Sequence, residues 1–410
     1  MPAVLADFKQ RKQTLLAQCA REQSLARATS VHRHLRWLSD LCDESLSALW
    51  QHSEMPQTFA LLAVGGYGRQ ALFPYSDVDV LVLLPNDIDL EAHPELKEKV
   101  ETFIGRCWDM GLEIGSSVRQ QQECLAEALA DITVQTALLE SRHITGSAAL
   151  SESFQKAFQT QLDPRTFFTG KTLEMHQRHS KFENTPYALE PNCKESPGGI
   201  RDLQAILWVA KAAGLGNSWD ELGRSGVATA LEVRQLKRHE AALRTIRTHL
   251  HCVAHRREDR LVFDLQHAVS QSLHLTAEGA GTTPRSASEA LMKRYYWSAK
   301  AVTQLHQILM LNIDEWINRD QLTRRRLGKR HRPQGGITEL AEFRDRIAIG
   351  PKAPKLAGLI VAEDMGAFEF GEFCTAIEPT GRDAGSLAMR ESQKRFVNRG
   401  RPGCDIVPHA

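Results

Sequence analysis

Apolar residues follow two different patterns in the first 84 residues. Between residues 5 and 52, leucines recur near the helical period with charged residues between them, which predicts helices. These leucines are Leu35, Leu38, Leu41, Leu46 and Leu49. From residue 59 to residue 84, two short continuous apolar runs are separated by a stretch that contains glycine and polar residues. Short apolar runs bounded by turn residues are typical of buried strands, so this region predicts two strands.

Later segments return mostly to the helical pattern. Residues 87–95 are polar and predict a loop, and residues 112–115 (LEIG) predict a short strand. The polar, turn-rich residues 163–200 predict a long connector. Helical periodicity predicts helices over 94–111, 121–146, 148–162, 201–213, 228–256 and 285–316.

Beyond Trp316 the periodicity is lost, and arginine and lysine crowd residues 319–332. A basic run of this kind can contact RNA or an acidic partner, but more often it is a solvated or disordered tail. The chain is therefore predicted to divide into an N-terminal helical segment (1–58), a domain with strands (59–165), an all-helical domain (166–317) and a basic, poorly ordered tail (318–410).

Composition places the chain among ordinary globular proteins. It has 410 residues, of which 42% are hydrophobic and 25% charged, and its net charge is +1. This charge balance predicts neither a nucleic acid nor a membrane surface as partner. The N-terminus lacks the apolar segment of a signal peptide, and the eight cysteines include no CxxC pair. We therefore expect reduced thiols and a location in the cytoplasm of a bacterium.

Candidate chemistry lies between the two predicted strands. The first apolar run ends at Gly65-Gly66, and after a gap of ten residues Asp77 and Asp79 precede and enter the second run. Alternate residues of a strand share a face, so both carboxylates point the same way, roughly 7 Å apart. They repel each other unless a cation joins them, and Mg²⁺ prefers oxygen ligands. The alternative interpretation is a pair of aspartates that only caps a turn.

The whole arrangement resembles the active-site motif of the polymerase-β-like nucleotidyltransferases. Six blocks, in order, further resemble the bacterial family of bifunctional uridylyltransferase/uridylyl-removing enzymes, which act on the signalling protein PII. The blocks are GGYGRQALFPYSDVDVLVLL (65–84), CWDMGLEIGSSVR (107–119), TALLESRHITG (136–146), YALEPNCKESPGGIRDLQ (187–204), HRREDRLVFDLQ (255–266) and MKRYYWSAK (292–300). The resemblance implies an α+β fold, in which a nucleotidyltransferase domain with a mixed sheet precedes an all-helical domain. It also implies transfer of UMP from UTP to a tyrosine of PII.

The resemblance assigns roles to particular residues. Asp77 and Asp79 would hold Mg²⁺, and Glu113 is favoured over Asp109 as the third carboxylate because it lies between two apolar residues. The nucleotide-binding candidates are Gly65, Gly66, Arg69 and Ser76. Glycine N–H groups approach phosphates closely, and Arg69 would offset phosphate charge.

Several of these residues also have plainer interpretations. Arg69 could be an ordinary surface arginine, and Ser76 could simply close a turn. Lys194 and Arg201 could meet nucleotide or PII, or could serve the fold alone. His251 and His255, four residues apart, are interpreted as residues on a helix face rather than as zinc ligands.

The sequence also departs from the family pattern. The family usually has His at Ser116, Glu or Gln at Ala71, and Gly at Ser196 and His255. Its members are about twice as long and continue into an HD-type hydrolase domain and two ACT domains. We expect this chain to lack uridylyl-removing activity, and we interpret the tail as a foreign reading frame joined to a truncated gene. Two alternatives stay open: an adenylyltransferase of the same superfamily, or a non-catalytic module that binds PII or nucleotide.

Overall fold

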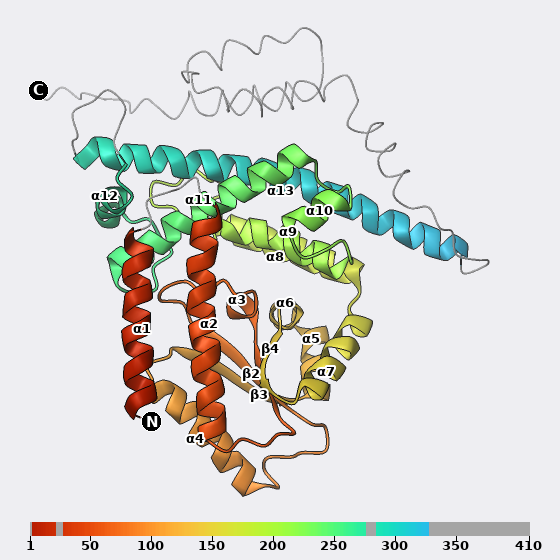
Figure 1. Ribbon diagram of the computed structural model, residues 1–410. Helices are drawn as coiled ribbons and strands as arrows, with labels where there is room; N and C mark the ends of the chain where they lie inside the picture. Colours follow the sequence, from red (N-terminus) through yellow and green to blue (C-terminus); the bar gives the residue numbers. More distant parts are fainter. Residues whose placement is uncertain (1, 22–27, 276–283, 328–410) are drawn as a thin grey trace, which may run out of the picture. The chain divides into compact units, whose positions relative to one another are not determined.

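The leucine pattern builds two long helices at the start of the chain, α1 (Pro2–Arg21) and α2 (Ala28–His52). The structure is a computed structural model that describes residues 2–21, 28–275 and 284–327 (Figure 1). These residues belong to one compact unit, Met1–Gln334. Most of the predicted tail (318–410) lies outside the described residues. The predictions that it is poorly ordered and that it comes from a foreign reading frame therefore concern residues outside the described ranges.

A four-stranded mixed sheet follows the two helices. Its strands are β1 (Ala60–Ala63), β2 (Val78–Leu84), β3 (Ile114–Gln120) and β4 (Arg142–Gly146). The order is β3-β2-β1-β4, with β1 antiparallel to both β2 and β4 and with β2 parallel to β3. The predicted α+β class with a mixed sheet is therefore confirmed.

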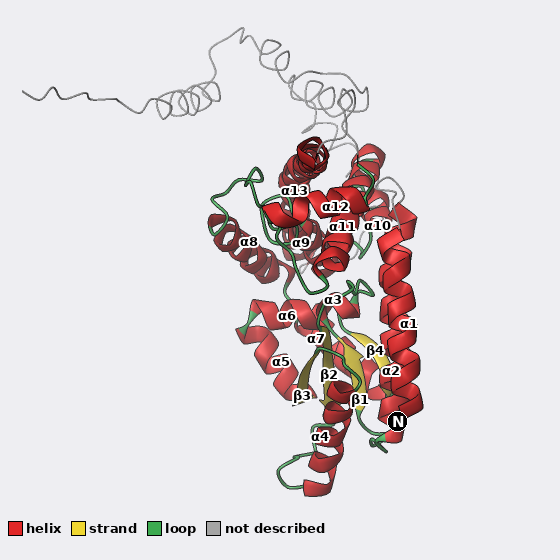
Figure 2. Cartoon of the chain, turned by 90° about the vertical axis from the view of Figure 1, so that its left-hand side faces the viewer, coloured by secondary structure: helices red, strands yellow, loops and turns green. Residues whose placement is uncertain are grey.

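Helices cover both faces of this sheet (Figure 2). Val78, Val80 and Val82 of β2 share one buried cluster with residues of α2 and of α4 (Pro94–Asp109). Leu81 and Leu83, which alternate with them, join a second cluster. That cluster includes residues of α5 (Gln121–Ala130), α6 (Ile132–Leu139) and α7 (Ala148–Gln161). A strand buried on both faces is apolar throughout, which explains the continuous run in its sequence.

The predicted helix over residues 121–146 is wrong at its end. Asp131 caps α6 by accepting hydrogen bonds from the backbone N–H groups of Thr133 and Val134, and α6 ends at Leu139. The next residues form β4, whose β-branched Ile144 and Thr145 favour a strand. All residues of β4 are half-buried, so the strand lacks the alternation that would have identified it.

The predicted connector over residues 163–200 is also wrong in its first half, which forms α8 (Pro164–Ser180). Asp163 caps this helix through the N–H of Thr166, and Pro164 occupies its first turn. The helix buries Lys171 and Arg178 as well as Phe167. Because its buried side chains are partly basic, apolar periodicity did not reveal it.

The rest of the described chain is helical. Its elements are α9 (Ile200–Ala212), α10 (Trp219–Arg224), α11 (Ala230–Ala254), α12 (Phe263–Ser272) and α13 (Pro284–Leu327). The sequence predicted α9, α11 and α13 but not the shorter α10 and α12. Helix α13 runs along α9, α11 and α12 and ends ten residues beyond the predicted boundary at residue 317 (Figure 1). The buried cluster on the sheet face covered by α5, α6 and α7 continues into these helices, so the strands and the helical region share a core.

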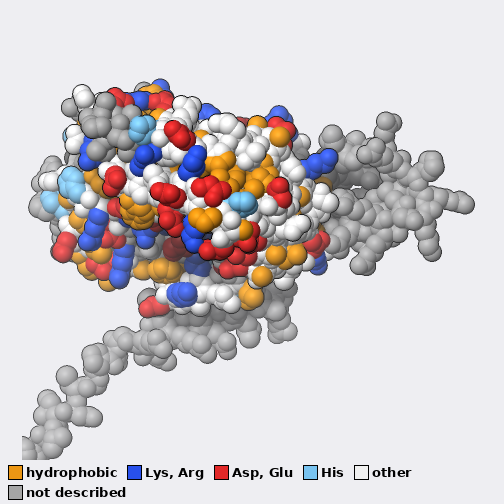
Figure 3. Space-filling model, turned by 90° about the horizontal axis from the view of Figure 1, so that it is seen from below, with side chains coloured by type: hydrophobic (Ala, Val, Ile, Leu, Met, Phe, Trp, Pro, Cys, Tyr) orange, Lys and Arg blue, Asp and Glu red, His pale blue; other side chains and the backbone are white. Residues whose placement is uncertain are grey.

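Among the described residues, no helix combines the length and the apolar character needed to cross a bilayer. On the face shown in Figure 3, acidic and basic side chains are interspersed with apolar ones. This mixture agrees with the nearly balanced composition of the sequence.

The backbone at the end of α11 explains why glycine is the usual family residue at position 255, where this chain has His255. His255 follows the last helical residue and has left-handed backbone angles, with φ of 52°. Glycine adopts this conformation without steric cost and is the usual residue at such helix ends. We expect His255→Gly to raise the free energy of unfolding by up to about 1 kcal/mol, measured by urea denaturation. His255→Ala, which keeps a Cβ atom, should give no such gain; an equal gain would show that the histidine side chain, not its backbone angle, is the cause.

Candidate active site

The two aspartates of the motif lie where β2 begins. Asp79 alternates with Val78 and Val80, which are buried on the α2 and α4 side of the sheet. The Asp79 side chain therefore points to the opposite face, toward the side covered by α5, α6 and α7. Asp77 precedes the strand by one residue, and its charge acts on Asp79. The structure thus brings the two predicted carboxylates together.

The surroundings of Asp79 favour a bound cation. Partial burial and the nearby Asp77 carboxylate raise the pKa of Asp79 above its ordinary value, and Lys194 and Arg257 offset part of this rise. Both effects penalise a second negative charge at this place. A divalent cation would remove the penalty on both carboxylates at once, so Asp77 and Asp79 fit the predicted Mg²⁺.

A glycine on the neighbouring strand makes room for Asp79. Gly115 of β3 is the register partner of Asp79 in the parallel pair β2–β3. A Cβ atom added to Gly115 would lie 2.5 Å from Asp79 Oδ1, closer than real Cβ contacts allow. The carboxylate of Asp79 therefore lies directly against the backbone of β3, and only glycine permits this position.

This contact leads to a prediction. Gly115→Ala should push the Asp79 carboxylate aside and lower the rate of nucleotidyl transfer roughly 10- to 100-fold, because small displacements of reacting groups cost this much. The free energy of unfolding should change by less than about 1 kcal/mol, because the atom that must move is the end of a side chain. Steady-state kinetics and urea denaturation would measure the two effects.

Gly105 provides the control. It lies in α4, where an added Cβ atom meets nothing within 4 Å. Gly105→Ala should leave the rate unchanged and raise helix stability by up to about 1 kcal/mol. Unchanged activity in Gly115→Ala would mean that the position of the Asp79 carboxylate does not limit the reaction.

Asp77 forms an ion pair with a residue that is distant in the sequence. Arg257, which follows α11, donates a hydrogen bond from Nη1 to Asp77 Oδ2. Both side chains are largely exposed, Asp77 at 41% and Arg257 at 54%. The helical region thus places a guanidinium group against the first aspartate of the motif. Arg257 lies in a family block (255–266), but nothing in the spacing of the sequence indicates that it meets Asp77.

The structure does not place Glu113, the predicted third carboxylate, in one metal-binding group with Asp77 and Asp79. The backbone N–H of Val78 donates to the carbonyl of Glu113 at 2.8 Å, so Glu113 immediately precedes β3 beside the start of β2. Its side chain is exposed, as is that of the competing Asp109 at the end of α4. Within the described ranges, no three carboxylate, histidine or cysteine side chains are placed to hold one metal ion. The role of Glu113 therefore stays a prediction.

The predicted glycines lie beside Asp79. A Cβ atom on Gly65 would be 3.7 Å from Asp79 Oδ2, and one on Gly66 would be 3.7 Å from Arg69 Nη2. Gly65 thus places backbone without a side chain next to the Asp79 carboxylate, and Gly66 does the same next to Arg69, as phosphate binding would require. Ser76 takes part in a turn in which its N–H donates to the carbonyl of Phe73 at 3.1 Å. Nucleotide contacts of Gly65, Gly66 and Ser76 stay predictions.

Arg69 is not the surface arginine that the plainer interpretation assumed. Its side chain is 20% exposed and forms an ion pair with Glu140, which is 4% exposed. Its guanidinium also lies 5.6 Å from the ring centre of Trp208 on α9. Arg69 therefore connects the segment that follows Gly65-Gly66 to Glu140, just after α6, and to α9. A contact between Arg69 and nucleotide stays a prediction.

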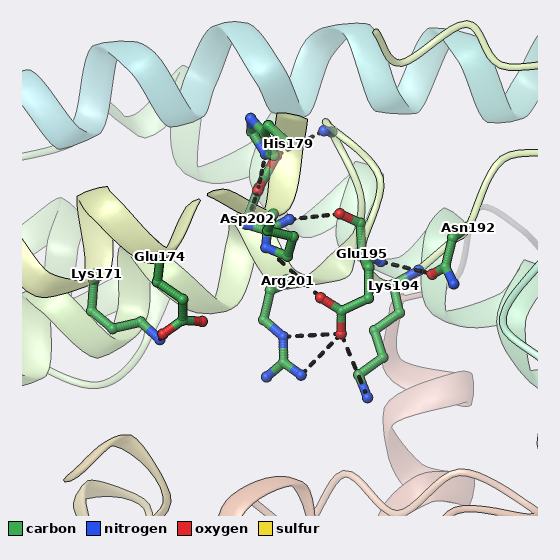
Figure 4. Close-up of polar contacts among 10 residues, drawn as sticks. Lys171, Glu174, His179, Asn192, Lys194, Glu195, Arg201 and Asp202 are labelled. Atoms are coloured by element: carbon green, nitrogen blue, oxygen red, sulfur yellow. Dashed lines mark hydrogen bonds and ion pairs between the residues drawn. The ribbon is translucent and has the colours of Figure 1, made fainter. Parts of the chain in front are cut away.

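A charged segment of the helical region contains Lys194, whose charge acts on Asp79; Figure 4 shows the contacts within this segment. The side chain of Asn192 accepts hydrogen bonds from the backbone N–H groups of Lys194 and Glu195, at 2.9 and 2.8 Å. Glu195 in turn pairs with Lys194 at 3.7 Å and with Arg201 at 3.0 Å. Burial lowers the pKa of Lys194, with Arg201 and Arg247 acting in the same direction. The charge of Lys194 acts on Asp79. Arg201 forms an ion pair with Glu195, and a contact of Arg201 with nucleotide or PII stays a prediction.

The two histidines at the end of α11 have different surroundings. His251 is buried and its Nε2 lies 3.1 Å from Asp259 Oδ1, whereas His255 is exposed. In the part of the chain that the structure describes, neither histidine belongs to a group that could hold a metal.

Comparisons with known proteins match two families along the chain. A nucleotidyltransferase domain family matches residues 44–132, and a family described as GlnD PII-uridylyltransferase matches residues 166–310. The chain is similar to the bifunctional uridylyltransferase/uridylyl-removing enzymes of Burkholderia lata, Burkholderia mallei and Burkholderia thailandensis, each with 53% identity. The matched regions contain 309, 310 and 311 residues, respectively.

The extent of these matches bounds the conclusion. They cover 75% of this chain but only 34% of each relative, so the chain spans about a third of their length. The match includes the domain that carries Asp77 and Asp79 and most of the helical region that provides Lys194 and Arg257. Over these residues the chain belongs to the family of bifunctional uridylyltransferase/uridylyl-removing enzymes and contains its nucleotidyltransferase domain.

Proposed function

We propose that this chain is a Mg²⁺-dependent uridylyltransferase that transfers UMP from UTP to a tyrosine of PII and releases pyrophosphate. The observation that carries the proposal is the position of Asp79 between Gly65 and the charge of Asp77, in a chain 53% identical to relatives named for uridylyl transfer. The specificity for UTP and PII rests on the relatives' names and on the family blocks. The location we propose is the bacterial cytoplasm, on the cysteine usage of the sequence.

The reaction requires little covalent chemistry from the protein. The tyrosine oxygen forms a bond to the α-phosphorus of UTP, the bond from that phosphorus to the bridging oxygen breaks, and pyrophosphate leaves with the electron pair. The tyrosine proton passes to solvent or to a nearby base. Catalysis of this type depends on positioning and on charge stabilisation.

The residues of the chain would share these tasks. Asp77 and Asp79, with Glu113 as the predicted third ligand, would hold Mg²⁺, which when bound neutralises phosphate charge and favours the ionised hydroxyl. Gly65 and Gly66 would let backbone N–H groups approach the phosphates. Lys194, whose positive charge acts on Asp79, would add to the positive potential on the nucleotide side.

The test is transfer of label from each α-labelled nucleoside triphosphate to purified PII, with the full chain and Mg²⁺. The proposal expects transfer from UTP alone, blocked by replacement of the acceptor tyrosine. Transfer from ATP would instead support an adenylyltransferase. If folded protein transfers no label but still binds PII or nucleotide, the chain is a binding module and the proposal fails.

A further inference from the structure

In the segment between α11 and α12, most charged side chains form ion pairs with residues of the helical region. Arg256 pairs with Glu258 at 2.7 Å, and Arg260 pairs with Glu190 at 3.2 Å. Asp259 accepts from Arg247 at 2.6 Å and lies 3.1 Å from His251. Arg257 differs from its neighbours, because its partner is Asp77 in the nucleotidyltransferase domain.

The backbone of this segment is anchored just after Arg257, and helix α11 ends at Ala254 just before it. Asp259 provides the carbonyl that accepts from the N–H of Cys193 at 2.7 Å, and the N–H of Leu261 donates to Pro191 at 2.9 Å. The Arg247 guanidinium, only 6% exposed, fixes the Asp259 carboxylate from inside the protein. These contacts hold the segment in place, so Arg257 is presented to Asp77 from a fixed base.

The ion pair itself contributes little to folding. Exposed pairs of this kind stabilise proteins by about 0–1 kcal/mol, so the Arg257–Asp77 contact can open at small cost. The same carboxylate is the proposed ligand of a divalent cation. Arg257 occupies Oδ2 of Asp77, so a cation that takes this oxygen competes with the guanidinium for it.

Released from Asp77, the guanidinium would still lie beside the metal position, because its base is fixed. A nucleoside triphosphate bound through that metal brings several negatively charged oxygens to this place. Arginine binds phosphate oxygens in a planar, two-pronged geometry, which makes it the natural side chain for such an exchange.

We propose that Arg257 is a positioning residue that exchanges partners: a divalent cation displaces it from Asp77, and it then binds the phosphate groups of the nucleoside triphosphate. The inference rests on the proposed function only in that it takes a nucleoside triphosphate and a divalent cation as the ligands of this site. It makes the helical region a direct part of the nucleotide site and couples metal binding to nucleotide capture.

The test measures binding, not turnover. Mn²⁺ alone is titrated into the full chain and followed by electron paramagnetic resonance, for the parent protein, Arg257→Gln and Arg256→Gln. Arg256 is one residue away and carries the same charge, but pairs with Glu258, so it controls for general electrostatics. Arg257→Gln should bind Mn²⁺ about 3- to 5-fold more tightly than Arg256→Gln, because the competitor of the metal is gone.

UTP binding in the presence of Ca²⁺, measured by calorimetry, should show the opposite effect. Arg257→Gln should weaken UTP binding at least about 5-fold, and Arg257→Lys should recover part of the loss, since it restores the charge but not the planar geometry. Circular dichroism and urea denaturation confirm that each variant is folded.

Two results would overturn the inference. Equal Mn²⁺ affinities in Arg257→Gln and Arg256→Gln would exclude competition at Asp77. Tighter Mn²⁺ binding together with unchanged UTP affinity would show that Arg257 shields the carboxylate without passing to phosphate. Both measurements omit PII, so a failure of the proposed transfer reaction would not be mistaken for a failure of this inference.

Discussion

Asp79→Asn is expected to lower the rate of nucleotidyl transfer by about a thousand-fold or more, equal to about 4 kcal/mol of activation free energy. The substitution keeps the shape of the side chain but removes the charge that a divalent cation requires. Asp79 lies against Gly115 and beside Gly65, so an amide should fit the same space. Single-turnover transfer of label from UTP to PII, at saturating Mg²⁺, would measure the loss.

Substitutions at two further carboxylates, Asp109 and Glu113, test whether the loss of rate is specific to the proposed metal ligands. Asp109→Asn is the matched control, because Asp109 is exposed at the end of α4 and should leave the rate within about two-fold of the parent protein. Glu113→Gln should lower the rate by about a hundred-fold if Glu113 is the third ligand. A large loss in Asp109→Asn with none in Glu113→Gln would reverse that assignment. Near-normal transfer by Asp79→Asn would contradict the metal site itself.

Local sequence pattern predicted the elements whose side chains separate cleanly by polarity. The leucine face of α2 and the continuous apolar run of β2 are examples, because one is buried on one side and the other on both. Helix α8 escaped prediction because it buries Lys171 and Arg178 along with Phe167. Strand β4 escaped because its place is set by backbone pairing with β1 rather than by an apolar face of its own.

The candidate site shows the same limit. Asp77 and Asp79 are two residues apart in the sequence, and strand alternation alone predicts that their side chains share a face. Gly115 and Arg257 meet the two aspartates only through the fold, by the register of β3 and by the path of the chain after α11. Short-range spacing cannot reveal contacts of this kind, because the residues are separated by whole elements.

Arg69 illustrates a different difficulty. A basic residue next to a glycine pair and an aspartate motif suits phosphate binding, and the sequence alone offered only that role or a surface position. Its pairing with buried Glu140 and its position over Trp208 depend on helices far along the chain. A substitution at Arg69 would therefore disturb packing as well as chemistry, which makes it a poor probe of nucleotide binding.

The largest expected effect on stability lies in the helical region, at Asp202. The carboxylate of this residue is fully buried and joins α9 to the end of α8 and to the turn before α9 (Figure 4). It accepts from Arg178 at 2.6 Å, from the backbone N–H of Gly198 at 2.7 Å, and lies 2.9 Å from His179 Nε2. Gly198 packs directly against α13, because a Cβ atom at Gly198 would lie 2.1 Å from the carbonyl oxygen of Ala299.

Asp202→Ala should therefore lower the free energy of unfolding by about 3–5 kcal/mol, because it removes the 2.6 Å partner of the buried Arg178 guanidinium and leaves Glu195, at 3.7 Å, as its remaining carboxylate partner. The loss would be measured by urea denaturation at neutral pH, with the slope of the transition checked against the parent protein. A transition that keeps its slope but moves to lower urea would assign the effect to the native network.

Asp220 provides the matched control for this loss. It pairs with Lys237 at 2.7 Å, nearly the same distance as Asp202 to Arg178, but its side chain is 65% exposed. Asp220→Ala should cost at most about 1 kcal/mol, because solvent screens an exposed pair and hydrates the lysine that remains. The difference between the two variants measures the combined effect of burial and of the additional partners of Asp202, since the substituted residue type and the pair distance are alike. Equal losses would contradict this explanation and would mean that Arg178 finds new partners when Asp202 is removed.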